Sequence, residues 1–159
     1  MKLSNLFFAI CCGVFANAAN AANITIFYAP TCPHCHHARD FISNTLIYEY
    51  DELLVEEVNV ANVDNRQAFV DALYKCGYHK GGVPVIVIGE KCFQGYSDAS
   101  QADLRAAIEI DLTDAQKSAA TANRNQMAQN KDAFVAAHPD RKNAVSEKDT
   151  QKKNNEVQN

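Results

Sequence analysis

The sequence contains two closely spaced cysteines that are suited to thiol–disulfide chemistry, Cys32 and Cys35, with Pro33 and His34 between them. Such a pair can open and close a disulfide, because a thiolate attacks one sulfur and the neighbouring thiol resolves the mixed disulfide that forms. The same spacing also occurs in structural disulfides and as half of a zinc site. The elements on either side of the pair help to decide between these roles.

A strand is expected before the pair and a helix after it. Residues 24–28 are β-branched or aromatic, which predicts a buried strand. Residues 35–47 place their apolar side chains on one face, which predicts a helix. Free amide groups and the positive end of the helix dipole stabilise a thiolate at such a junction. We therefore expect Cys32 to be the nucleophile, Pro33 to occupy the first turn, and His34 to help stabilise the sulfur.

The rest of the chain up to residue 111 alternates between strands and helices. Further strands are expected at residues 53–60, 83–88 and 92–95, and further helices at 64–77 and from about 97 to 108. The resulting order is β-α-β-α-β-β-α, which predicts an α/β domain over residues 22–111. Its first two strands should be parallel, because a helix crosses over between them.

Beyond residue 111 the composition changes. Residues 112–137 are rich in alanine and begin with a capping-box pattern at Thr113 and Gln116, which predicts a helical extension. Most of its apolar side chains are small, so the extension is expected to bury little surface. Residues 138–159 combine mixed charges with few large apolar groups, which predicts a disordered tail.

Residues 1–21 have the pattern of a secretory signal peptide, with Lys2, a short apolar stretch and then small residues. This predicts a periplasmic or secreted protein. The apolar stretch is shorter than the roughly 20 residues that span a bilayer, so no stable membrane insertion is expected. Cys11 and Cys12 raise the alternative of a lipid anchor. Without Lys2 the 15 basic residues become 14, against 19 acidic residues, which argues against a nucleic-acid partner. We expect a monomer.

Cleavage would leave four cysteines, and an even number in an exported chain favours disulfides. Cys76 ends the second predicted helix and Cys92 opens the fourth predicted strand, so the two flank the Val83-Pro84 segment. We predict a structural disulfide between Cys76 and Cys92. Two free thiols, or a second redox pair that relays electrons to Cys32 and Cys35, are the alternatives.

Three segments resemble a known family. They are Phe27-Tyr28-Ala29-Pro30-Thr31-Cys32-Pro33-His34-Cys35, Gly82-Val83-Pro84, and residues 89–98, GEKCFQGYSD. These segments resemble the glutaredoxin branch of the thioredoxin superfamily over about residues 24–111. The Pro33-His34 dipeptide is the one found in DsbA disulfide oxidases. The resemblance implies a thioredoxin-like fold and a thiol–disulfide oxidoreductase.

The resemblance also implies a substrate site and partners. In that family the proline of the third strand is cis, and the residue before it lies beside the active-site sulfurs. Val83 and Pro84 are therefore expected to offer backbone hydrogen bonds to a bound thiol or peptide, and Tyr28 is expected to contact substrate. The implied partners are protein thiols or disulfides, glutathione as a small substrate, or a membrane redox protein. No cofactor is implied beyond the redox-active disulfide.

Two alternatives use the same residues for other chemistry. His34, His36 and His37 beside two thiols could bind copper or zinc, as in a periplasmic metallochaperone. The segment from Cys32 to His36 also matches the C-x-x-C-H pattern of covalent haem attachment. Pro33 inside the pattern and the strand leading directly into it argue against haem. We favour thiol–disulfide exchange without a metal, with His36 and His37 as solvated helix residues.

Overall fold

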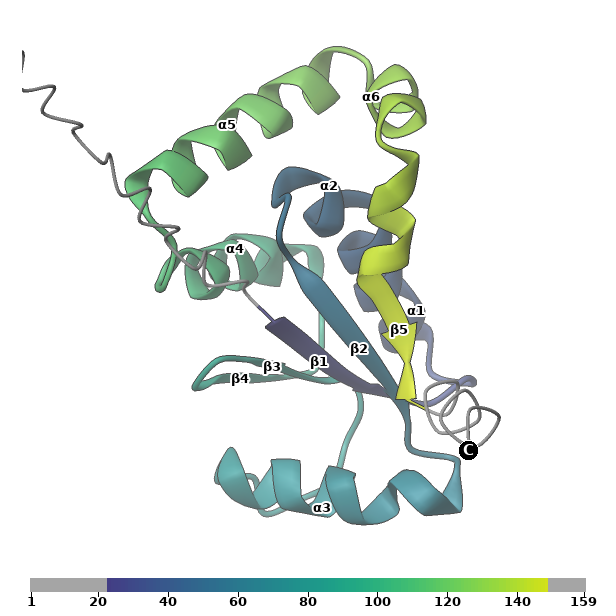
Figure 1. Cartoon of the computed structure of the whole chain (residues 1–159). Coiled ribbons are helices and arrows are strands. Elements are labelled where there is room, and N and C mark those ends of the chain that lie inside the picture. Colours follow the sequence, from purple (N-terminus) through teal and green to yellow (C-terminus); the bar gives the residue numbers. More distant parts are fainter. Residues whose placement is uncertain (1–22, 149–159) are drawn as a thin grey trace, which may run out of the picture.

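Five strands form one mixed sheet in the order β4-β3-β1-β2-β5 (Figure 1). They are β1 (Asn23–Tyr28), β2 (Leu54–Asn59), β3 (Val85–Ile88), β4 (Lys91–Gln94) and β5 (Val145–Glu147). β1 is parallel to β2, as predicted from the crossover helix, and antiparallel to β3, which forms a hairpin with β4. This computed structural model describes residues 23–148. The predicted signal peptide and residues 149–159 lie outside the described residues.

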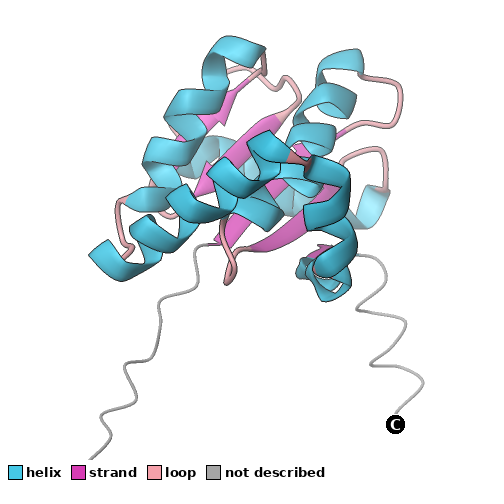
Figure 2. Cartoon of the chain, turned by 90° about the horizontal axis from the view of Figure 1, so that it is seen from above, coloured by secondary structure: helices cyan, strands magenta, loops and turns pink. Residues whose placement is uncertain are grey.

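Helices cover both faces of the sheet (Figures 1 and 2). They are α1 (Pro33–Phe41), α2 (Ile47–Glu49), α3 (Arg66–Lys75), α4 (Gln101–Glu109), α5 (Asp114–Gln129) and α6 (Lys131–Ala137). A π-helical turn, Ile42–Leu46, joins α1 to α2, so the helix predicted over 35–47 is three consecutive segments. Short 3-10 turns precede α3 and α4. Within residues 23–148, no helix is both long and apolar enough to cross a membrane.

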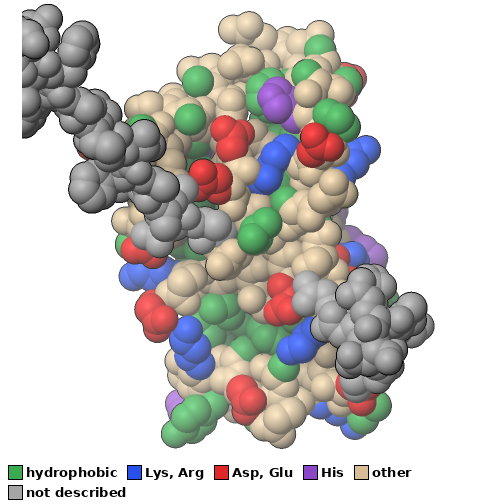
Figure 3. All heavy atoms as spheres, viewed as in Figure 1, with side chains coloured by type: hydrophobic (Ala, Val, Ile, Leu, Met, Phe, Trp, Pro, Cys, Tyr) green, Lys and Arg blue, Asp and Glu red, His purple; other side chains and the backbone are tan. Residues whose placement is uncertain are grey.

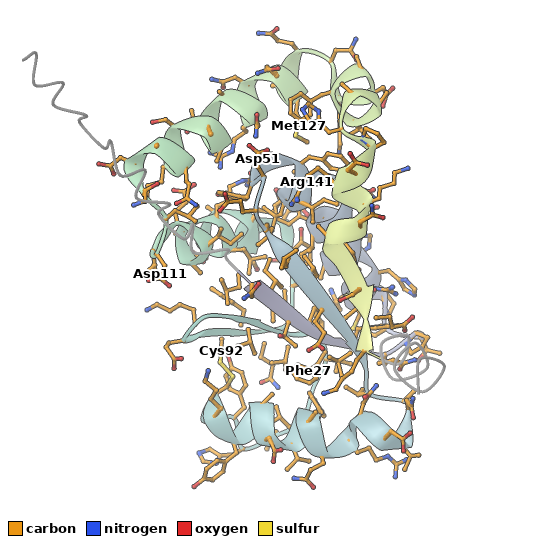
Figure 4. All side chains as sticks on the ribbon, in the orientation of Figure 1. Phe27, Asp51, Cys92, Asp111, Met127 and Arg141 are labelled. Carbon is orange, nitrogen blue, oxygen red and sulfur yellow. A yellow bond between two sulfur atoms is a disulfide. The ribbon has the colours of Figure 1, made fainter. Side chains whose placement is uncertain are left out.

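The central strand β1 contributes to two cores because its side chains alternate between the faces of the sheet. Ile24 and Ile26 belong to the larger core, which α1 and α4 cover. Phe27 belongs to the smaller core under α3, where its ring lies 5.6 Å from that of Phe69. Figure 3 shows apolar side chains gathered between the sheet and α3, and Figure 4 shows Phe27 on that side. This two-sided burial confirms the α/β, thioredoxin-like fold.

The alanine-rich extension forms two helices, α5 and α6, and the predicted capping box of Thr113 and Gln116 begins the first of them. The extension is packed against the domain, because Ala120, Met127 and Phe134 are buried in the larger core. Their burial removes apolar surface from water although most of the neighbouring side chains are small.

A buried carboxylate also ties the extension to the domain. Glu49, at the end of α2, is 2% exposed. It accepts two hydrogen bonds of 2.7 Å from Arg105 of α4 and one of 3.2 Å from Arg124 of α5. Two guanidinium groups therefore compensate one buried charge, which would otherwise be costly to bury.

The prediction of a disordered tail over residues 138–159 is wrong for its first part. Residues Pro139–Ala144 form a 3-10 helix, and the three residues after it form β5, which pairs in parallel with β2. The tail thereby covers one edge of the sheet (Figure 1). A paired strand satisfies backbone groups that an open edge would leave exposed.

Arg141 explains why this part of the tail is structured. Its guanidinium donates hydrogen bonds to the carbonyl oxygens of Ile47, Tyr50 and Leu53 at 2.8, 3.0 and 2.8 Å. Figure 4 shows Arg141 reaching from the tail toward the turn between α2 and β2. Burial lowers the pKa of Arg141. The charge-assisted hydrogen bonds to three carbonyls offset that cost of burial.

Candidate active site

The cysteine pair lies where β1 ends and α1 begins. Cys32 is the N-cap residue of α1 and Pro33 is the first residue of the helix. The backbone N–H of Cys35 donates to the Cys32 sulfur at 3.2 Å. The same N–H also donates to the Cys32 carbonyl oxygen at 3.1 Å, so it is shared between that oxygen and the sulfur. It lies in the first turn of α1, where the positive end of the helix dipole can stabilise a thiolate. The two cysteines form a disulfide with their Cα atoms 5.2 Å apart.

The two cysteines differ in their access to solvent. Cys32 is half-buried, whereas Cys35 is 1% exposed and contributes to the buried face of α1. An attacking thiolate can reach only a sulfur that is open to solvent. The arrangement therefore favours attack at Cys32, with Cys35 as the resolving cysteine.

The loop before β3 lies beside the pair. The Val83–Pro84 peptide bond is cis, as the resemblance implies. The carbonyl oxygen of Val83 lies 3.5 Å from the Cys32 sulfur, and Pro84 is buried. The loop is held by β4 and the residue after it: Gly95 N–H donates to the Pro84 carbonyl at 2.8 Å, and the Gln94 side chain donates to loop carbonyls. A role of this loop in binding substrate stays a prediction.

The three histidines near the pair differ in their contacts. His34 is exposed on the first turn of α1, and its ring makes no hydrogen bond to any residue from 23 to 148 while the disulfide is closed. His36 is also exposed, but its Nε2 lies within hydrogen-bonding distance, 2.7 Å, of the Pro30 carbonyl oxygen. His36 is therefore not simply a solvated residue. His37 lines a polar hollow between α1 and the start of α4.

The metal alternative gains no support from this arrangement. Within the described part of the chain, no group of three or more histidine, cysteine, aspartate or glutamate side chains is placed to hold a metal ion. In the disulfide form shown here the cysteine pair also offers no thiolate ligand.

The expectation that Tyr28 contacts substrate needs correction. Tyr28 is 4% exposed and its hydroxyl donates to Oε1 of Glu147 at 2.6 Å. The guanidinium carbon of Arg39 lies 4.0 Å from the centre of the ring. Burial, together with the hydrogen bond to Glu147, raises the pKa of the Tyr28 hydroxyl to about 12. Both the ring and the hydroxyl of Tyr28 are therefore engaged by protein groups, which leaves little of this side chain for a substrate.

Three residues around Tyr28 were not predicted from the sequence: Arg39, Glu57 and Glu147. Arg39 of α1 pairs with Glu57 of β2, which is 6% exposed, and that hydrogen bond raises the pKa of Arg39. Glu57 had a detectable signal, since it is a charged residue at an inward position of a buried strand. Glu147 had none, because an acidic residue in a charged tail resembles its neighbours.

The second cysteine pair is joined in the structure. Cys76 is the C-cap of α3 and Cys92 lies in β4, with their Cα atoms 5.8 Å apart. Gly77 follows with φ +68°, a conformation that ends the helix and that glycine adopts without strain. Figure 4 shows Cys92 between the hairpin and α3. Of the three alternatives for this pair, the structure contains the disulfide.

A C-x-x-C pair at the N-terminus of the helix after β1, beside a cis-proline loop, is the arrangement of a thioredoxin-like thiol–disulfide oxidoreductase. Residues 24–93 match the family model for glutaredoxin, so this part of the chain is glutaredoxin-like. Among solved structures, the crystal structure of a glutaredoxin from Archaeoglobus fulgidus matches with 20% sequence identity and a TM-score of 0.41. That match covers 54% of this chain and 88% of the other. No curated protein sequence matches the chain significantly.

Proposed function

We propose that the protein is exported and that its Cys32–Cys35 disulfide oxidises thiols of protein substrates in the periplasm or outside the cell. The observation that carries the proposal is the unequal access of the two sulfurs. Cys32 is half-buried at the N-cap of α1, whereas Cys35 is 1% exposed. Only Cys32 is placed to form a mixed disulfide with a large substrate.

The exchange takes place in two displacement steps. A substrate thiolate attacks the Cys32 sulfur, the Cys32–Cys35 bond breaks, and Cys35 leaves with the electron pair and takes up a proton. The second substrate thiolate then attacks the substrate sulfur of the mixed disulfide, and Cys32 leaves as a thiolate. The substrate becomes a disulfide and two electrons pass to the cysteine pair. A membrane redox protein or glutathione disulfide would reoxidise the pair.

The direction of exchange depends on how well the Cys32 thiolate is stabilised. The Cys35 amide already points at the Cys32 sulfur in the disulfide form. The same amide would stabilise the thiolate of the reduced form, as would a protonated His34. Stabilising the reduced form makes the disulfide a stronger oxidant. An oxidising compartment is consistent with the disulfides of all four cysteines in residues 23–148.

The reduction potential of the Cys32–Cys35 pair tests the proposed direction. We would equilibrate the protein with glutathione buffers and, in parallel, follow disulfide formation in a reduced dithiol peptide, with Cys32→Ser as the inactive control. A potential near about −120 mV and oxidation of the peptide would support an oxidase of the DsbA type. A potential near about −270 mV would overturn the direction and indicate a reductant.

Export has a separate test. The full-length chain would be expressed in a bacterium and the N-terminus of the accumulated protein determined by mass spectrometry. We expect cleavage close to Ala21 or Ala22 and recovery from the periplasm or medium. An intact Met1 on protein in the cytoplasmic fraction would contradict export.

A further inference from the structure

A side-chain contact joins the two ends of the segment that carries the redox pair, residues 28–39. Tyr28 is the last residue of β1, four positions before Cys32, and Arg39 is four positions after Cys35. The guanidinium of Arg39 lies over the Tyr28 ring at 4.0 Å, in the geometry of a cation–π contact. This contact brings the two ends of residues 28–39 together, and both redox cysteines lie between them.

Each member of the contact is held by a carboxylate from a different strand. Glu147 of β5 accepts the hydrogen bond of the Tyr28 hydroxyl at 2.6 Å. Glu57 of β2 pairs with the Arg39 guanidinium and is buried. The Nε of Arg39 is buried and has no hydrogen-bond partner within residues 23–148. The orientation of Arg39 therefore depends on Glu57 and on the position of the Tyr28 ring.

The position of this segment matters because the Cys32 sulfur contacts two different parts of the protein. The amide of Cys35 belongs to the same helical turn as Cys32 and moves with it. The Val83 carbonyl oxygen lies 3.5 Å from the sulfur, but it belongs to the loop before β3 and does not move with this turn. A small shift of residues 28–39 against the sheet would therefore change the surroundings of the sulfur, and with them the relative stability of its disulfide, thiol and thiolate forms.

We propose that Glu147, in the C-terminal strand β5, is a positioning residue of the redox centre that acts through Tyr28 and Arg39. Glu147 does not touch the sulfurs. It holds the Tyr28 side chain, and the Tyr28 ring in turn positions Arg39 and thereby both ends of residues 28–39. The C-terminal segment is then part of the scaffold that sets the redox properties of Cys32. The inference rests on the thiol–disulfide exchange proposed above.

A comparison of variants in the full-length protein tests this inference. The variants are Glu147→Ala, Glu147→Gln, Tyr28→Phe and the double variant Glu147→Ala/Tyr28→Phe. The matched control is Tyr50→Phe, because the Tyr50 hydroxyl also donates to a carboxylate, Glu109, at 2.7 Å. Tyr50 precedes β2, so it lies at the opposite end of the parallel strands β1 and β2 from the cysteine pair. For each variant we would measure the equilibrium constant for exchange with glutathione, the thiolate absorbance of Cys32 against pH, and the free energy of unfolding.

The proposal predicts a particular pattern among these variants. Glu147→Ala and Tyr28→Phe should change the exchange constant at least threefold and in the same sense, which corresponds to about 14 mV for a two-electron couple. The double variant should shift it no further than either single variant, since both changes break the same link. Glu147→Gln keeps an acceptor oxygen and should restore most of the parent value. Tyr50→Phe should alter stability only.

Two outcomes would overturn the proposal. In the first, Glu147→Ala lowers stability but leaves both the exchange constant and the Cys32 titration at parent values. In the second, the effects of Glu147→Ala and Tyr28→Phe add, which would mean that they act independently. The thiolate titration needs no substrate, so it reports on Glu147 even if the parent protein fails to oxidise the dithiol peptide. Failure of the proposed function is thereby distinguishable from failure of this inference.

Discussion

Replacing both Cys76 and Cys92 by alanine should lower the free energy of unfolding by about 3 kcal/mol. The disulfide links positions 16 residues apart, and closing a loop of that size removes about 10 cal/mol/K of entropy from the unfolded chain. At 25 °C this entropy is equivalent to about 3 kcal/mol. The apolar face of α3 packs on the smaller core through partly buried side chains such as Phe69, but no residue of α3 is fully buried. The disulfide is therefore expected to contribute a large share of what holds α3 in place.

The noncovalent contacts at the same place are weak by comparison. Lys75 at the end of α3 pairs with Glu90 of the hairpin at 3.2 Å, and their side chains are 51% and 89% exposed. An exposed ion pair of this kind contributes about 0.2–1 kcal/mol. Lys75→Met is therefore the matched control, since it removes the Lys75 contacts to Glu90 and to the Gly89 carbonyl but keeps the disulfide. We expect it to cost less than about 1 kcal/mol.

Urea unfolding of the parent and the variants would measure both effects, with the Cys32–Cys35 disulfide kept oxidised throughout. Mass mapping after alkylation should first show Cys76 linked to Cys92 in the parent. A loss below about 1 kcal/mol in the double variant would refute the argument that the disulfide holds α3 to the sheet. Recovery of Cys76 and Cys92 as two alkylated thiols in the parent would refute its premise.

Four further changes have expected outcomes. Cys35→Ser should accumulate mixed disulfides with a dithiol peptide on nonreducing gels, whereas Cys32→Ser should form none. Equal trapping by both variants would contradict the assigned roles. His34→Ala should lower the potential of the pair by about 30 mV or more, because one charge-assisted hydrogen bond of about 1.5–3 kcal/mol to the thiolate is lost; an unchanged potential in glutathione buffers would make His34 a bystander. The pKa of Tyr28 is about 12 in the folded protein against 10.0 for an unperturbed tyrosine, so the folded state holds this proton more tightly. The resulting stabilisation is complete below about pH 10 and is lost between about pH 10 and 12, at up to about 1.4 kcal/mol per pH unit. Tyr28→Phe should remove this contribution and make the fall of urea-unfolding stability with pH less steep, while the part that comes from Tyr50, whose pKa burial also raises, remains. A slope equal to that of the parent would contradict this. Arg141→Ala should lower stability by at least about 2 kcal/mol in thermal and urea unfolding, since three carbonyls lose a charged donor; a loss within about 0.5 kcal/mol would show that the tail packs without it.

The amino-acid sequence by itself determined the order of the elements and the place of the cysteine pair. The alternation of Ile24 and Ile26 with Phe27 indicates a strand buried on both faces, and such a strand belongs in the middle of a sheet. Pro33 directly after Cys32 indicates a helix start, which places the sulfur at the N-cap. These features were predictable because side-chain periodicity and cap preferences are local properties of the chain.

Only the tertiary structure decided what the polar residues of the C-terminal segment do. Glu147 finds its partner Tyr28 119 positions away, and Arg141 binds backbone carbonyls that carry no sequence signature. Both residues lie in a segment whose charge and low content of large apolar groups are also typical of disorder. Periodicity reports which face of an element is buried. It does not report which distant backbone or hydroxyl group a charged side chain meets, because that depends on how complete elements pack against one another.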